Sequence, residues 1–93
     1  MSKTVEAVRI DKWLWAARFF KTRTLASDAV DNGKVRLNDE RTKPAHNLKI
    51  GDILAIDNGA SVWEVTVLLL SDTRSSAAIA QTLYRETEQS VVK

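Results

Sequence analysis

Residues 9–52 decide the fold of this 93-residue chain and read RIDKWLWAARFFKTRTLASDAVDNGKVRLNDERTKPAHNLKIGD. Up to Gly33 the apolar residues recur with the spacing of a helix, and beyond it they alternate with basic residues, as in a half-buried strand. The stretch therefore predicts two short helices, a glycine stop and a basic strand-turn-strand.

The first predicted helix has Asp11 as its N-cap and ends at Phe20–Lys21. At about 100° per residue, one face forms a core stripe. Its members are Ile10, Trp13, Leu14, Ala17 and Phe20.

Trp15 and Phe19 lie four residues apart on the opposite face of this helix, where they form a second apolar stripe. One interpretation is that these aromatic rings stack on unpaired bases. The other is that they dock a C-terminal helix through Ile79 and Leu83. We favour docking, because a small domain needs the additional core.

The second predicted helix runs from about Arg23 to Asn32, with Thr22 as its N-cap. Asn32–Gly33 supplies a left-handed C-cap. The expected buried face consists of Leu25, Ala26, Ala29 and Val30, and the outward residues are Ser27, Asp28 and Asp31. Two short helices with apolar faces and a tight joint must pack on each other or on a sheet.

The strands are predicted from segments of period two that are separated by turn residues. Lys34–Leu37 is followed by a turn at Asn38–Asp39, and Ile53–Ile56 is joined by a hairpin signal to a long arm over Val62–Leu70. Residues 75–88 are predicted to be helical. This order of elements indicates the α+β class.

The charges are concentrated in one part of the chain. Ten Lys/Arg residues and five acids lie between Arg9 and Lys49, a balance of +5, whereas residues 50–93 hold three bases and six acids, a balance of −3. Residues 1–8 are neutral, so the two balances sum to the net charge of +2. Clustered cations on one substructure favour a polyanion, and nucleic acid is the commonest polyanion in a cell.

The composition argues against several other kinds of site. The chain has no cysteine, which excludes a disulfide framework, a thiolate zinc site and a cysteine nucleophile. His46 is the only histidine and is a poor metal ligand on its own, so we expect neither a metal nor a cofactor. No stretch approaches the roughly 20 apolar residues of a membrane span. We therefore expect no membrane association and a cytoplasmic location.

Four blocks of the sequence, RIDKWL, KTRTLA, DNGKVRLN and KIGD, resemble the S-four RNA-binding domain, also called the alpha-L motif. The likeness covers residues 9–57, over half of the chain. The longer strings DKWLWAARFFKTR and SDTRSSAAIAQTLYRET resemble the ribosome-associated heat-shock protein fifteen family. The resemblance implies an S-four type RNA-binding domain over residues 9–70 and a C-terminal helical extension over residues 71–93. Its fold would be two short helices packed on a small, twisted antiparallel sheet, with a C-terminal helix.

The same resemblance implies the binding of structured ribosomal RNA, without catalysis. In the heat-shock-protein-fifteen family the target is the free large ribosomal subunit that still carries a nascent chain on transfer RNA. The implied role is a heat-shock-linked stress response that rescues or recycles stalled subunits, with peptidyl transfer RNA as a further partner. Family members commonly continue into a long basic tail, whereas the printed chain ends at Lys93 after an acidic stretch. We therefore expect no RNA contacts from such a tail.

The candidate RNA-binding residues combine phosphate-neutralising cations with a helix start. Lys21–Arg23 lies where the second helix begins, and its free N–H groups offer a seat for phosphate. The hydroxyl–arginine pair in this segment matches the S-four motif. We expect the cations to converge on one concave surface that fits folded RNA, with Lys34 and Arg36 on one strand face. The full set is Arg9, Lys12, Arg18, Lys21, Thr22, Arg23, Lys34, Arg36, Arg41 and Lys43, with Trp15 and Phe19 as candidate base-stacking residues.

Three other classes of protein are alternatives to an RNA-binding protein: an enzyme, a DNA-binding protein and a protein-interaction module. An enzyme is disfavoured, because there is no Gly-rich nucleotide loop and no plausible catalytic set. A helix-turn-helix DNA-binding protein would carry Asp28 and Asp31 on its recognition helix, where they repel phosphate, so we expect only weak, non-specific DNA binding. A protein-interaction module anchored on Trp15 and Phe19 would bind without the salt sensitivity of RNA binding. We expect a monomer on RNA, because no separate apolar surface is evident once the first helix is covered.

Overall fold

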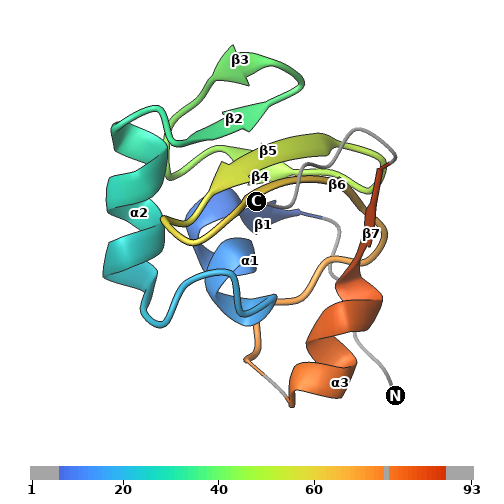
Figure 1. Ribbon diagram of the computed structural model, residues 1–93. Coiled ribbons are helices and arrows are strands. Elements are labelled where there is room, and N and C mark those ends of the chain that lie inside the picture. Colours follow the sequence, from blue (N-terminus) through green and yellow to red (C-terminus); the bar gives the residue numbers. More distant parts are fainter. Residues whose placement is uncertain (1–6, 75, 88–93) are drawn as a thin grey trace.

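A five-stranded antiparallel sheet with two helices on one face forms the frame of the structure (Figure 1). The structure is a computed structural model that describes residues 7–74 and 76–87. Its elements are β1 (Val8–Arg9), α1 (Ile10–Ala16), α2 (Arg23–Asp31), β2 (Val35–Leu37), β3 (Glu40–Arg41), β4 (Asn47–Leu48), β5 (Ile53–Asp57), β6 (Val62–Val67), α3 (Ala77–Ala80), the 3-10 helix η1 (Gln81–Leu83) and β7 (Tyr84–Glu86). The main sheet has the order β3-β2-β5-β6-β7, and β1 pairs with β4 beside it. The expected α+β class is confirmed.

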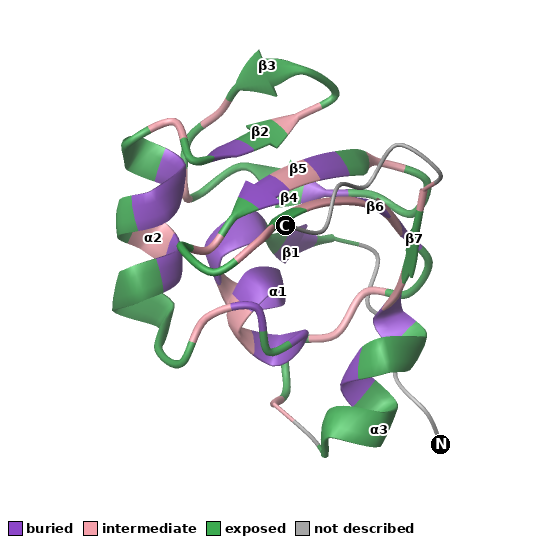
Figure 2. Cartoon of the chain, in the orientation of Figure 1, coloured by how far each residue is buried: buried purple, intermediate pink, exposed green. Residues whose placement is uncertain are grey.

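The core lies between the main sheet and the two helices. Alternate residues of β5 and β6 point toward the helices, and the register places Leu54 opposite Val65 on this face. The helices contribute Trp13, Leu14 and Val30, which are fully buried. Figure 2 shows the same division on α2, whose inner side is buried and whose outer side is exposed. Removal of this apolar surface from water is the main favourable contribution to folding.

Helix α1 begins at Ile10, and its start is satisfied by a neighbouring loop. The N–H groups of Ile10 and Asp11 donate to the backbone carbonyls of His46 and Pro44, at 2.8 and 3.3 Å. The N-cap residue is Arg9, whose side chain makes no capping bond. The prediction of Asp11 as the N-cap is therefore wrong, because loop carbonyls take up donors that a helix start leaves unpaired.

Helix α1 also ends earlier than predicted, because Arg18 adopts a left-handed conformation with φ of 67°. The N–H groups of Arg18 and Phe19 donate to the carbonyls of Trp15 and Leu14, at 3.1 and 3.0 Å. These two bonds form a Schellman motif. The turn interrupts the helical period, so Phe19 enters the core and Phe20 is only half-buried, the reverse of the predicted stripes.

Phe19 lies at the centre of an aromatic cluster. Its ring centroid lies 4.7 Å from that of Tyr84, 5.8 Å from that of Trp63 and 6.1 Å from that of Trp13. Because Phe19 is only 8% exposed, the prediction that it stacks on a base is wrong. The alternative, docking of a C-terminal helix through Ile79 and Leu83, holds only in part. Leu83 is buried in the same core as Phe19, whereas Ile79 remains 54% exposed and the ring contact comes from Tyr84 of β7.

Helix α2 has the caps that its sequence predicts. The hydroxyl of Thr22 accepts a hydrogen bond from the N–H of Leu25 at 3.0 Å. Gly33, with φ of 77°, supplies the left-handed turn after the last residue of the helix. Leu25 is 50% exposed, so its predicted place in the buried face is wrong.

The hairpin of β2 and β3 turns through Asn38 and Asp39, which have φ of 51° and 69°. Positive φ at both positions defines a type I′ turn, whose twist matches that of the flanking strands. The side-chain oxygen of Asn38 also accepts a hydrogen bond from the N–H of Ile53 at 3.0 Å. The predicted turn is confirmed, and Asn38 ties it to β5.

The C-terminal segment is helical only in part. Helix α3 and η1 are followed by β7, which pairs with β6 and brings Tyr84 opposite Val67. The prediction of a helix over residues 75–88 is therefore wrong for residues 84–86, because pairing with β6 covers what would be an exposed sheet edge. Residues 88–93 of the predicted extension lie outside the described residues.

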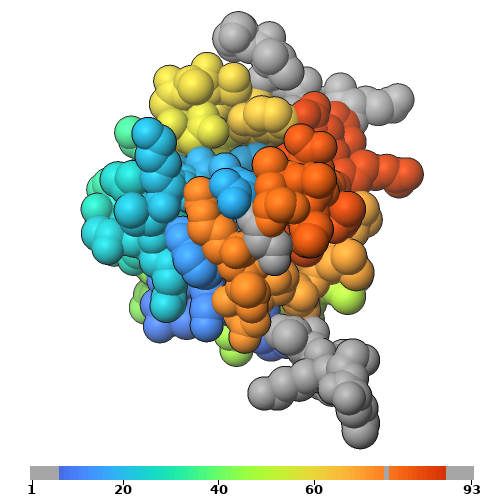
Figure 3. Space-filling view, turned by 90° about the horizontal axis from the view of Figure 1, so that it is seen from below, coloured from blue at the N-terminus to red at the C-terminus, as the bar shows by residue number. Residues whose placement is uncertain are grey.

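Arg74 fastens the segment between β6 and α3 to the joint between α1 and α2. Its Nη1 atom donates to the carbonyls of Trp15 and Phe20, at 2.6 and 3.1 Å, and its guanidinium carbon lies 5.9 Å from the centre of the Trp15 ring. Figure 3 shows this segment, in orange, lying against the blue surface of α1. The carbonyl of Trp15 lies in the last turn of α1 and also accepts a hydrogen bond from the N–H of Arg18, so Arg74 is a second donor to it.

Replacing Arg74 by Met is expected to lower the free energy of unfolding by about 1.5–3 kcal/mol, because hydrogen bonds from a charged donor are lost. Urea unfolding measures this change. Arg85→Met is the matched control, since Arg85 is exposed on β7, and its effect should stay within about 0.5 kcal/mol. Equal losses for the two variants would contradict the role given to Arg74.

Tyr84 is the only tyrosine, so its ultraviolet titration reports a single site. Burial, and after it the charge of Glu86, raises the pKa of Tyr84 above its ordinary value of 10.0. The folded state thus favours the protonated phenol, and this contribution to stability is present below the unfolded pKa and lost as pH rises through the raised pKa. Phenolate absorbance should therefore titrate at higher pH in the folded chain than in urea, and Glu86→Gln should remove only part of the difference. A folded midpoint at or below the unfolded one would be inconsistent with this packing.

Candidate nucleic-acid interface

A buried carboxylate flanked by two arginines lies where β1 runs into α1, next to the start of α2. Asp11 is 3% exposed, and Arg9 donates to it through Nε at 3.1 Å and through Nη2 at 2.9 Å. The Nη2 atom of Arg23, the first residue of α2, lies 3.9 Å from the same carboxylate. Arg9, Asp11 and Arg23 are referred to below as the Asp11 cluster.

Both guanidiniums of the Asp11 cluster remain open to solvent. The side chains of Arg9 and Arg23 are 47% and 45% exposed. The hydrogen bond to Asp11, and after it the charge of this carboxylate, raises the pKa of Arg9 above its ordinary value. The cluster therefore carries two fixed cations around one anion and can present guanidinium donors to a phosphate.

The start of α2 lies beside this cluster and borders a shallow hollow. The hollow has a volume of about 280 Å³ and is lined by Asp11, Arg23, Thr24, Ser27 and Asp28. The hydroxyl of Thr22 is already engaged as the helix cap. Thr22 therefore stabilises the start of α2, whether or not a ligand binds there.

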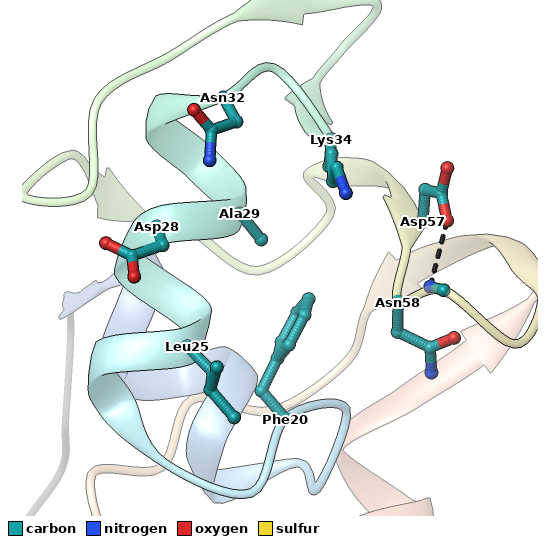
Figure 4. Close-up of a pocket in the computed structure, with 9 residues that line it drawn as sticks. Phe20, Leu25, Asp28, Ala29, Asn32, Lys34, Asp57 and Asn58 are labelled. Carbon is teal, nitrogen blue, oxygen red and sulfur yellow. Dashed lines mark hydrogen bonds between the residues drawn. The ribbon is translucent and has the colours of Figure 1, made fainter.

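A second hollow, a cleft of about 260 Å³, runs between α2 and the turn after β5 (Figure 4). Phe20 and Leu25 line it with apolar surface, and Lys34 lies near Asp57 on the opposite side. Asp57 accepts a hydrogen bond from the N–H of Gly59 at 3.0 Å. Lys34 thus borders a cleft that is also lined by the carboxylates of Asp28 and Asp57.

The cations of the β2–β3 hairpin lie apart from the Asp11 cluster. The register places Arg36 opposite Arg41 on one side and opposite Ala55 on the other. Val35 and Leu37 pack toward the core, so Arg36 projects from the outer face of the sheet, away from the helices. Arg36 and the Asp11 cluster are thus on different sides of the sheet, and the prediction of one concave surface for all the cations is wrong.

Arg41 has a structural partner. Its Nη2 atom donates to the carbonyl of Asp31, at the end of α2, over 2.7 Å. A cation at this position satisfies a carbonyl that the helix leaves unpaired and interacts favourably with the helix dipole. Arg41 is therefore less available to RNA than its exposure indicates.

The remaining predicted residues are accessible to different degrees. Lys12 is half-buried on α1, and the exposed positions are Arg18, Lys21 and Lys43. Trp15 is half-buried, with the guanidinium of Arg74 near one side of its ring. Base stacking by Trp15 stays a prediction.

Sequence reasoning missed two residues that organise this region, Asp11 and Arg74. Asp11 was expected to cap its helix, although its spacing of two from Arg9 also allows a paired arginine and carboxylate. Arg74 had no local signal, because its partners lie 54 and 59 residues away along the chain. Both roles depend on tertiary structure.

Two other kinds of site are not found within residues 7–74 and 76–87. No three acidic, histidine or cysteine side chains in these ranges gather in a way that could hold a metal ion. No helix in the same ranges has the length and apolarity needed to cross a membrane.

Comparisons with known proteins agree with this geometry. The family model described as S4 domain matches residues 8–54. The chain is 48% identical over 92 residues to the heat shock protein 15 homolog of Aeromonas salmonicida, and this alignment covers 99% of this chain and 70% of that relative. It is 35% identical over 81 residues to the RQC P-site tRNA stabilizing factor of Bacillus subtilis (strain 168), and this alignment covers 85% of this chain and 94% of that relative. The solved structure of Vibrio cholerae heat shock protein 15, described as trimeric, has a TM-score of 0.88 at 47% identity and covers 91% of this chain and 86% of that one.

The matched region includes both helices, the hairpin and the first part of β5, and this fold defines an S4 domain, a class of RNA-binding domain. Within this class, the chain belongs to the heat shock protein 15 family. The resemblance seen in the sequence is thereby confirmed.

Arg36 and Arg41 lie opposite each other in the β2–β3 hairpin. Substituting each of them in turn should distinguish a cation that stabilises the fold from one that does not. Arg41→Gln is expected to lower the free energy of unfolding by about 1 kcal/mol, because the charged cap on α2 is lost. Arg36→Gln should leave stability unchanged or raise it slightly, since like charges opposite each other repel. Chemical denaturation measures both variants, and a larger loss for Arg36→Gln would contradict the assignment.

Proposed function

We propose that this chain binds structured ribosomal RNA on the large ribosomal subunit, in the state in which the subunit carries a stalled nascent chain on transfer RNA. The observation that carries the proposal is the Asp11 cluster, which fixes two half-exposed guanidiniums beside the start of α2. Guanidiniums in fixed positions neutralise phosphates and form paired hydrogen bonds with them. Folded RNA presents phosphates in a defined geometry, so shape and backbone contacts would dominate over base reading.

Family membership supports the ribosomal part of the proposal. The Bacillus subtilis relative is named as a factor that stabilises transfer RNA in the P site, and the alignment with it extends over 85% of this chain. By analogy, peptidyl transfer RNA is a second partner of this chain, and its role is non-catalytic rescue or recycling of stalled subunits under heat stress. The cytoplasm, where ribosomes work, is the proposed location.

RNA would contact the helix side of the molecule first. The proposed contacts there are Arg9, Lys12, Arg18, Lys21, Thr22, Arg23 and Lys34, with Trp15 available to a base. Arg36, Arg41 and Lys43 would reach a second RNA segment from the hairpin, because Arg36 lies on the outer face of the sheet. One copy is sufficient for this interface in the proposal, since the Asp11 cluster is complete within a single chain.

DNA is the second candidate ligand, and the surface of α2 argues against specific recognition of it. Asp28 and Asp31 are exposed on the outer side of this helix. Two carboxylates would repel phosphates of the duplex at the place where a recognition helix enters the major groove. Only weak, charge-driven DNA binding is expected.

The double variant Arg23→Ala/Lys34→Ala tests the proposed surface. Affinity for isolated large ribosomal subunits is expected to fall about 10-fold or more, because two phosphate contacts are lost. Arg85→Ala removes an exposed cation from β7 and should bind as the unchanged chain does. Circular dichroism verifies the fold of each variant, and unchanged binding by a folded double variant would overturn the proposed site.

A further inference from the structure

Asp11 differs from the other acids in the structure because it is buried. Among residues 7–74 and 76–87 it is the one charged side chain in the buried class. A buried carboxylate is unfavourable unless charged or hydrogen-bonding partners surround it. The neighbours of Asp11 that meet this need are Arg9 and Arg23, both of which are proposed RNA contacts.

The geometry leaves most of the arginine donors available. A guanidinium has five N–H donors, and Arg9 uses two of them on Asp11, through Nε and Nη2, which leaves three. Arg23 approaches the carboxylate with one nitrogen, at 3.9 Å. The carboxylate therefore restrains Arg9 at the end of β1 through two hydrogen bonds and attracts Arg23 at the start of α2 by charge, while both arginine side chains stay half-exposed.

We propose that Asp11 is a positioning residue for RNA binding, which holds the guanidiniums of Arg9 and Arg23 in the orientation that RNA phosphates meet. This inference rests on the proposed function and deepens it. Long side chains lose conformational freedom when they bind a ligand, and restraint before binding removes part of that loss. Asp11 thus increases affinity for a polyanion although its own charge is negative.

The direction in which Asp11→Asn changes the affinity for RNA distinguishes positioning from simple electrostatics. Asp11→Asn keeps the size of the side chain and makes the molecule more positive by one unit. If charge alone mattered, this change would strengthen binding to RNA. If Asp11 positions the arginines, binding weakens.

Asp28→Asn is the matched control. Asp28 lines the same hollow as Arg23, is exposed, and gives the same change in net charge. Affinities are measured with isolated large ribosomal subunits at one salt concentration. We expect Asp11→Asn to bind about 10-fold more weakly than the unchanged chain and Asp28→Asn to bind equally or more tightly. Equal or tighter binding by a folded Asp11→Asn variant would overturn the proposal.

A second comparison does not depend on the stability of Asp11→Asn. Arg9→Lys keeps the charge but removes the two-pronged contact with the carboxylate. We expect it to weaken binding several-fold, whereas Arg85→Lys, an exposed change on β7, should have no effect. Unchanged binding by Arg9→Lys would contradict the proposal even if Asp11→Asn failed to fold.

Combination of the two substitutions distinguishes positioning from a purely structural role. If Asp11 acts through Arg9, the variant Asp11→Asn/Arg9→Lys should bind about as well as Asp11→Asn alone. Fully multiplicative losses would mean that Asp11 does not act through Arg9 and would overturn the inference. Failure of the unchanged chain to bind subunits would instead overturn the proposed function, so the two failures are distinguishable.

Discussion

The left-handed turn at Arg18 is the constraint on which the arrangement of the helices depends. It ends α1 at Ala16 and sends Phe19 into the aromatic cluster with Trp13, Trp63 and Tyr84. A left-handed residue other than glycine costs about 1–2 kcal/mol, and burial of a phenylalanine contributes about 1.5–3 kcal/mol, so the packing of Phe19 offsets the turn. Four more helical residues would extend α1 by about 6 Å and carry the start of α2 away from Asp11.

The proposed interface is a consequence of this turn. Because the chain reverses directly after α1, Arg23 returns to the neighbourhood of Arg9, and one buried carboxylate lies next to both. Other cations serve the fold itself. Arg41 caps the end of α2, and Arg74 binds the carbonyls of Trp15 and Phe20 at the joint between α1 and α2. The number of basic residues therefore overestimates how many cations are available to RNA. The orientation of the arginine side chains matters for RNA binding as well as the total charge.

Local signals in the sequence predicted the parts of the fold that local chemistry determines. Thr22 caps α2, Gly33 ends it, and Asn38–Asp39 forms the hairpin turn. The turn at Arg18 could not be predicted, because no glycine marks it and the compensating contacts of Phe19 come from β6 and β7. The same limit applies to the C-terminal segment, where pairing with β6 overrides a helical pattern. For the candidate site, the residue types and the helix start were predictable, whereas the burial of Asp11 and the outward position of Arg36 depend on tertiary packing.

Cations on the helix side are proposed to bind ribosomal RNA through its phosphates. The most direct test of this proposal is co-sedimentation of the chain with separated large and small ribosomal subunits across a series of salt concentrations. Enrichment on large subunits is expected, with the logarithm of the affinity falling by about four to five units per logarithmic unit of salt, as about five or six phosphate contacts require. Binding that does not respond to salt, or no binding to either subunit, would contradict the proposal.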